Sequence, residues 1–235
     1  MTVPSANLVL DPHTGVLRTV ALLRVPALVA FGALGAVNLV AIAANPWTFR
    51  FGHQHATIAF EGGPWTWLSV GLLLATALVV HAATRQRADH SWWSAVAAVF
   101  AYLAVDEGLM VHERFDDLAG TAGVDHYGWA IPGSILVLGI AGLFARWFSS
   151  LESGLRLHLL VAGGLYVAGA LVVEVLAGMW QTARGEDRVF FLITTIEETL
   201  EVVGPLLVIR TMFSLVPRSS VVVDTPPAIA PAPVG

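Results

Sequence analysis

Two short stretches of this chain place acidic and histidine side chains in apolar surroundings. The first reads AVDEGLMVHERF over residues 104–115, and the second reads IEETLE over residues 196–201. A further carboxylate, Glu174, stands alone in the apolar run LVVEVLAG. Carboxylates and imidazoles without thiolates are the ligands that hard or borderline divalent ions prefer. The candidate metal ligands are Asp106, Glu107, His112, Glu113, Glu174, Glu197, Glu198 and Glu201.

This ligand set matches that of dinuclear metal sites in helix bundles, which combine four to six carboxylates with one or two histidines. A divalent metal cofactor, in a mononuclear or dinuclear centre, is therefore expected, with Fe or Mn favoured over Zn. The spacing differs from that precedent, because neither acidic stretch contains Glu-x-x-His. Two alternatives stay open: the carboxyl groups are protonated, or they line a water-filled vestibule.

The composition decides which elements must position these side chains. Of the 235 residues, 56% are hydrophobic and only 12% are charged, with a mean hydropathy of +0.74. Soluble domains carry about 25% charged residues, so this is the composition of a membrane protein. The absence of cysteine excludes disulfides, thiolate metal sites and cysteine nucleophiles. A net charge of −5 without a basic patch argues against a nucleic-acid partner.

Six apolar stretches are long enough to cross a bilayer, which needs about 20 residues per helix. The chain is therefore predicted to be an all-α, polytopic membrane helix bundle with a six-helix transmembrane domain over 20–213. A cytoplasmic tail (1–19) precedes this domain, and a Pro/Ala-rich disordered tail (214–235) follows it. The expected helices span roughly 20–43, 65–84, 92–113, 128–148, 157–180 and 189–213.

Arginine placement predicts the orientation, because cytoplasmic loops are enriched in basic residues. An N-in/C-in arrangement puts eight arginines inside and four outside, and it places all eight tryptophans at predicted helix ends. All twelve basic residues are arginine, which with abundant Ala, Gly and Val favours a bacterial genome of high GC content. The expected location is thus the bacterial plasma membrane, as a multi-pass protein. A cleaved signal peptide is the alternative interpretation of the first helix, which ends in Ala-Ile-Ala at 41–43.

The acids of three expected helices lie at one depth. Asp106, Glu174 and Glu197 each stand six to eight residues from the outer end of their helix. At 1.5 Å per residue, all three lie about 10 Å below the outer surface. The sequence therefore predicts a shared polar site in the outer half of the bilayer.

The helical periodicity predicts which side chains face this site. Glu197, Glu198 and Glu201 span about 100° of one helix face. On a continuous helix Asp106 and Glu113 are nearly eclipsed and central, with Glu107 or His112 turned in as a further ligand. Three loop histidines, expected to be exposed but with a ligand or base role as the alternative, fall on the same side: His53, His55 and His126.

The two acidic motifs resemble those of a family of bacterial multipass membrane proteins of unassigned function. In that family an apolar helix ends in Asp-Glu-x4-His-Glu, and a later helix carries Glu-Glu-x2-Glu followed by Gly. The resemblance covers roughly 92–115 and 190–210. It implies a shared site and brings no activity with it.

Four functions compete at this stage. The favoured one is a metal-dependent membrane enzyme, an oxidoreductase or hydrolase, which acts on a lipophilic small molecule at the outer leaflet. The second is a proton or cation transporter or channel that uses the same acids. The third is a metal-free membrane enzyme that uses a protonated carboxyl group as its acid. The fourth is a structural subunit of a larger complex. The partners expected in the first case are the lipid bilayer and the lipophilic substrate.

Overall fold

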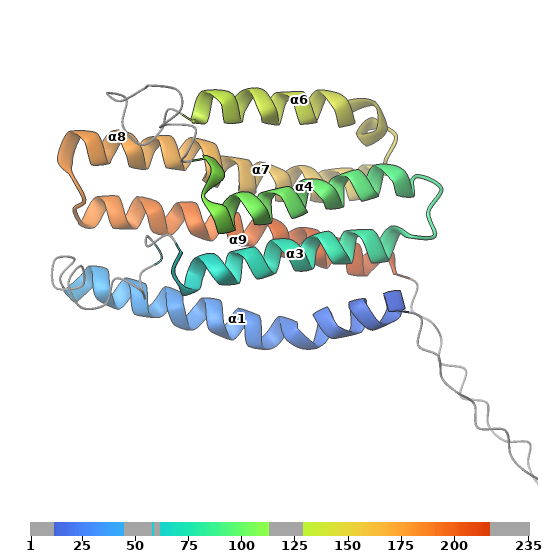
Figure 1. The fold of residues 1–235 in the computed structure, drawn as a ribbon, viewed down its shortest axis with the longest axis horizontal. Helices are drawn as coiled ribbons and strands as arrows, with labels where there is room; N and C mark the ends of the chain where they lie inside the picture. Colours follow the sequence, from blue (N-terminus) through green and yellow to red (C-terminus); the bar gives the residue numbers. More distant parts are fainter. Residues whose placement is uncertain (1–11, 45–57, 59–61, 113–128, 217–235) are drawn as a thin grey trace, which may run out of the picture.

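In the computed structural model, the chain forms a bundle of helices that is described over residues 12–44, 58, 62–112 and 129–216 (Figure 1). No β-strand occurs within these ranges, which confirms the all-α prediction for them. The helix η2 is a π-helix, and it joins α7 to α8 without a break. These ranges therefore fold into six continuous helical segments, which we call rods. The elements are α1 (Pro12–Ala44), α3 (Pro64–Thr84), α4 (His90–Leu109), α6 (Ala130–Ser149), α7 (Ser153–Val167), η2 (Ala168–Val173), α8 (Glu174–Arg184) and α9 (Arg188–Leu215).

Four of the rods are long and apolar enough to cross a membrane. They are α1 over Gly15–Val40, α3, α6, and the α7–η2–α8 rod over Ser153–Arg184. Large apolar side chains also point outward, as a bilayer requires; on α6, Ile131 and Leu138 are both 72% exposed. Within the described ranges, α4 and α9 do not meet the same combination of length, hydropathy and low charge. These two helices carry the acidic motifs.

The rods alternate in direction, because short connections join α3 to α4, α6 to α7 and α8 to α9. Figure 1 shows α1 at one edge of the bundle and α6 at the opposite edge. Between them, α3 packs against α1, α4 and α9, and α9 also packs against α7, η2 and α8. We call the end with the α3–α4 turn the Asp89 end and the end with the α8–α9 turn the Asp187 end.

Most helix boundaries lie within a few residues of the expected ones, but two differ. Helix α1 begins at Pro12, so the second half of the expected tail is helical up to the membrane segment. Helix α4 ends at Leu109 rather than at 113. At the other end, α9 continues to Leu215, and residues 217–235 of the expected disordered tail lie outside the described ranges.

Two glycines allow the α7–η2 rod to approach α9 closely. A Cβ atom on Gly169 would lie 2.9 Å from the carbonyl oxygen of Glu197 and 3.0 Å from Cγ of Glu201. A Cβ atom on Gly204 would lie 2.8 Å from the carbonyl oxygen of Ala162. Small residues at helix contacts let the backbones approach closely. The van der Waals packing that results stabilises contacts between helices in lipid. This contact fixes the helix with three glutamates against its neighbour.

Candidate functional site

A cavity of about 690 Å³ lies between α4, α6, the α7–η2–α8 rod and α9. Its size is within the usual range for sites that hold a small organic ligand. Towards the Asp187 end its wall is polar and carries the acidic motifs. Towards the Asp89 end its wall is apolar. We call this second part the apolar stem, whose lining includes Val96, Phe100, Val137, Ile140, Phe144 and Leu159.

Every described member of the predicted site lines this one cavity. The acids come from α4, from the first position of α8 and from α9, as the common depth in the sequence predicts. We call the following residues the carboxylate cluster: Asp106, Glu107, Glu174, Glu197, Glu198 and Glu201. His112 also lines the cavity. The remaining candidates, Glu113, His53, His55 and His126, lie outside the described residues.

Glu201 is within electrostatic reach of four other members of the carboxylate cluster. The charges of Glu107 on α4, Glu174 on α8, and Glu197 and Glu198 on its own helix all act on it. Carboxylates from three rods are thus near enough to influence one another. Such a group of like charges is stable in a bundle only if donors, protons or cations compensate it.

The π-helix sets the direction of Glu174. Upstream, Leu155, Ala162 and Gly169 are buried at a spacing of seven residues, which is two turns along one α-helical face. The same spacing predicts 173 and 176 as the next inward positions, yet the buried residues are Ala177 and Gly178. A π-helix inserts about one extra residue into the turn, and this moves every later position by one. The shift brings Glu174 to the cavity, and nothing in the sequence signals it.

The early end of α4 changes the geometry of the first motif. Met110 has φ of 51°, a left-handed conformation that is unfavourable for a residue with a side chain. The carboxylate of Asp106 accepts the backbone N–H of His112 at 3.1 Å and lies 3.0 Å from its ring Nδ1. The prediction of one continuous helix through Glu113 is therefore wrong. Because the chain turns back at Met110, His112 pairs with Asp106, which it could not reach six positions along a straight helix.

Indole N–H groups donate to two members of the carboxylate cluster. Trp65 on α3 donates to Oε2 of Glu198 at 2.8 Å, and Trp129 donates to Oε1 of Glu174. Gly133 leaves room for the Trp129 ring, which would collide with a Cβ atom at that position. Hydrogen bonds to a carboxylate are stronger than neutral ones, so neutral donors can hold an acid inside an apolar bundle. From the sequence, these tryptophans were expected only at the membrane interface, so this role was missed.

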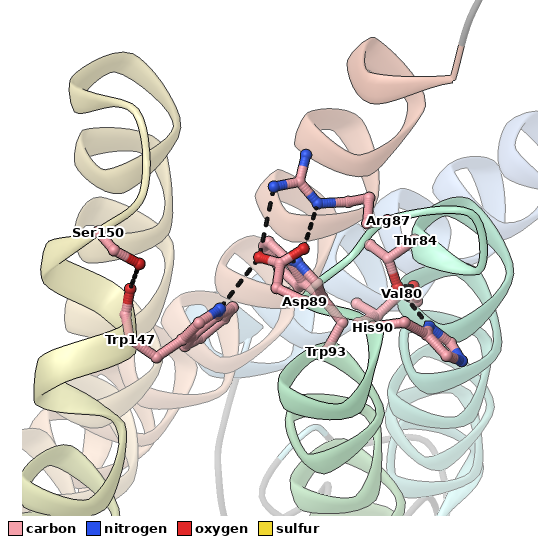
Figure 2. Close-up of polar contacts among 8 residues, drawn as sticks. All are labelled: Val80, Thr84, Arg87, Asp89, His90, Trp93, Trp147 and Ser150. Carbon is pink, nitrogen blue, oxygen red and sulfur yellow. Dashed lines mark hydrogen bonds and ion pairs between the residues drawn. The ribbon is translucent and has the colours of Figure 1, made fainter.

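At the opposite end of the bundle, Asp89 binds Arg87 and the indoles of Trp93 and Trp147 (Figure 2). Its Oδ2 accepts the indole N–H of Trp93 at 3.1 Å and that of Trp147 at 3.0 Å, and Arg87 contacts its Oδ1 at 2.8 Å. Both tryptophans line the cavity, and Trp93 is fully buried. Burial raises the pKa of Asp89, but the bonds from Arg87, Trp147 and Trp93 outweigh it and lower the pKa below 3.8. The carboxylate of Asp89 thus holds the indole rings of Trp93 and Trp147, which form the floor of the apolar stem at the Asp89 end.

Two tyrosines were not among the predicted site residues. Tyr102 on α4 and Tyr166 on α7 both line the cavity. Asp106 acts electrostatically on both hydroxyl groups, and Glu201 also acts on Tyr166. A tyrosine in an apolar helix usually needs a polar partner for its hydroxyl group, and this is the signal that could have identified them.

The geometry does not form a metal centre from the described residues alone. Among them, no three His, Asp or Glu side chains converge closely enough to hold an ion. Asp106, Glu174 and Glu198 are engaged with His112, Trp129 and Trp65. A bound metal would require side-chain movement or ligands from candidates outside the described residues, which are Glu113 and the loop histidines.

Comparison with known proteins places the chain in a family. Residues 14–216 match the model of a family described as "Domain of unknown function (DUF8692)", and the chain belongs to that family. The match includes all the helices that line the cavity. No curated protein and no solved structure matches the chain. The family description supplies no activity, so the function must be inferred from the site.

Proposed function

We propose that this chain is an integral membrane enzyme that binds a lipophilic molecule in the cavity and acts on its polar end at the carboxylate cluster. One observation carries the proposal: acids from three rods line the polar end of a cavity whose remaining wall is apolar. An amphiphile satisfies both parts of such a wall at once. In this proposal the protein spans the bacterial plasma membrane six times, with both termini in the cytoplasm.

The chemistry would come from carboxyl groups, with or without a metal ion. With a divalent ion, Fe or Mn in preference to Zn, the cluster residues and His112 would supply oxygen and nitrogen ligands. Without one, a carboxyl group would serve as acid or base towards the polar end of the substrate. The absence of a converging ligand set among the described residues favours the metal-free version.

The stem gives less support to a transporter. An ion path needs polar groups from one side of the membrane to the other. The lining of the Asp89 half is apolar and ends at Trp93 and Trp147, whose N–H groups are bound to Asp89. Ions would have to leave the carboxylate cluster without ligands in that half.

Turnover of membrane lipids tests the enzyme proposal. Full-length protein in detergent is incubated with a bacterial lipid extract, with and without added Fe or Mn, and all lipid species are compared by mass spectrometry. Wild type should change the amount of at least one species, and Glu201→Gln should not. Glu152→Gln is the matched control, because Glu152 is exposed and does not line the cavity. No change of any species by wild type would overturn the proposal.

Metal content then decides between the two versions. Elemental mass spectrometry is applied to wild type, Asp106→Ala and Glu198→Ala. Near-stoichiometric Fe, Mn or Zn that is lost in both variants would establish a shared metal site. Metal-free protein that still turns over a lipid would establish acid–base chemistry by the carboxyl groups.

A further inference from the structure

The substrate class follows from the shape and charge of the cavity, if the proposed function holds. We infer that the ligand is a lipophile with a long apolar chain and a neutral or cationic polar end that donates hydrogen bonds. We also infer that it enters from the bilayer along the flanks of α6. Three properties of the cavity lead to this inference: its access, its length and its charge.

Access is lateral because α6 covers the cavity without closing its sides. Contacts between aromatic rings join α6 to α4 near each end: Trp147 stacks against Trp92 at 6.1 Å, and Trp129 lies 5.1 Å from the ring of His112. Between these levels, some residues that line the cavity keep a large accessible surface, as openings along the flanks of α6 would leave them. Leu136 on α6 is 46% exposed, and Tyr102 on α4 is 43% exposed. On the other flank, Leu160 of α7 is 56% exposed. The exterior at this height is the apolar surface of the bundle, so the ligand would come from lipid.

The cavity is long enough for an extended chain. Its lining on α6 runs from Trp129 to Phe148, which corresponds to about 28 Å of helix. The hydrocarbon part of a bilayer is about 30 Å thick. A chain with its polar end at the carboxylate cluster can therefore lie parallel to the bundle axis, with its far end against Trp93 and Trp147.

The charge of the polar end excludes an anionic headgroup. Six carboxyl groups line it, and no arginine is among the described residues of the lining. Like charges that are brought together in apolar surroundings repel one another. Carboxylate oxygens only accept hydrogen bonds, so they suit a hydroxyl or ammonium group. A phosphate or carboxylate headgroup would meet this negative charge, and His112 is the only side chain of the described lining that could offer it a positive charge.

Three matched probes test the inference. A long-chain alkyl amine, alcohol and phosphate share the same chain with a photoreactive diazirine within it. Each is added to full-length protein in nanodiscs, and the crosslinked residues are mapped by mass spectrometry. The amine and the alcohol should label stem residues of α4, α6 and α7 at least about tenfold more than the phosphate, a difference of about 1.4 kcal/mol.

Two glycine variants show whether the labelling reports the cavity. Gly163 lines the stem, and a Cβ atom there would meet nothing within 4 Å, so Gly163→Phe should fill the stem and abolish labelling. Gly139 also has open space, but it does not line the cavity, so Gly139→Phe should label as wild type does. Thermal unfolding confirms that both variants are folded.

The outcomes separate the inference from the function on which it rests. Phosphate labelling equal to that of the amine, and sensitive to Gly163→Phe, would overturn the substrate class alone. If all three probes label Gly163→Phe as strongly as wild type, lipophile binding in the cavity is overturned, and with it the proposed function. Loss of the preference for the amine in the Glu197→Gln/Glu201→Gln double variant is expected if the carboxylate cluster is its cause.

Discussion

Trp65 on α3 and Glu198 on α9 are 133 positions apart in the chain, and a 2.8 Å hydrogen bond from the indole N–H to the carboxylate joins them. The same pairing of an indole with an acid recurs between Trp129 and Glu174, and at both ends of the bundle on Asp89 and Asp187. An indole brings a donor without a charge, and its ring is itself apolar. This pairing explains how carboxyl groups can be held among apolar helices, although no arginine is among the described residues that line the cavity.

Replacing Trp65 with Phe removes one of these donors and keeps most of the ring. Trp65 is only 5% exposed, so water does not readily replace the lost bond. The free energy of unfolding should fall by about 0.6–2 kcal/mol, the range for hydrogen bonds between membrane helices. Thermal unfolding in detergent measures the change. Trp67→Phe on the same helix is the control, because Trp67 is 62% exposed and should leave the stability unchanged. Equal effects of both variants would contradict a structural role for the bond.

Counting residues predicted that three rods carry acids to one level. The prediction used only helix rise and the distance of Asp106, Glu174 and Glu197 from the ends of apolar runs. Both quantities depend only on the nearby sequence, so they do not change when the helices pack together. All three residues line the cavity. Whether these residues bind a metal stays a prediction.

The directions of individual side chains could not be predicted in the same way. The π-helix before Glu174 and the left-handed residue Met110 each shift a helical face, and each depends on contacts made after folding. The partners of Glu198 and Glu174 come from other rods, at separations of 133 and 45 residues. Periodicity within one helix contains no information on such pairs.

Gly169→Ala should disturb the carboxylate cluster without changing any charge. Its Cβ atom would lie 2.9 Å from the carbonyl oxygen of Glu197 and 3.1 Å from Cβ of Leu200, so η2 and α9 must separate. Such overpacking costs about 1–3 kcal/mol. The unfolding temperature and the extent of probe labelling should both decrease. Gly139→Ala is the matched control, because a Cβ atom there meets nothing within 4 Å and the residue does not line the cavity. A stable and fully labelled Gly169→Ala protein would show that the close approach is not required.

Asp89→Asn should loosen the floor of the stem. The amide loses the ion pair with Arg87, and its neutral oxygen accepts more weakly the two indole N–H groups that share Oδ2 in the wild type. We expect a lower unfolding temperature and a weaker preference of the probes for residues near Trp147. Glu152→Gln is the control, because Glu152 lies at the same end and makes no side-chain cap hydrogen bond to α7.

The pH dependence of this stabilisation has a defined sign. The pKa of Asp89 is lowered in the folded protein, because its hydrogen bonds and the Arg87 charge outweigh its partial burial. Its contribution is therefore fully present above the ordinary pKa of 3.8 and is lost as the pH falls through the lower folded value. The stability difference between wild type and Asp89→Asn should stay constant near neutral pH and decrease only in this acidic range. A difference that instead grows on acidification would contradict the assignment.

Asp106 is expected to hold the end of α4 in its turned-back conformation. Its carboxylate bonds both the backbone N–H and the ring of His112, two residues after the left-handed Met110. Asp106→Ala removes both bonds, and a hydrogen bond of this kind contributes about 0.5–1.5 kcal/mol, so exchange of the His112 amide hydrogen should become about two- to tenfold faster. Asp106→Asn keeps an oxygen that can accept the same N–H. The alanine variant should therefore exchange faster than the asparagine variant when both are measured in nanodiscs. If the two variants exchange at the same rate, the carboxylate does not hold the turn, and the strain at Met110 must be balanced by other contacts.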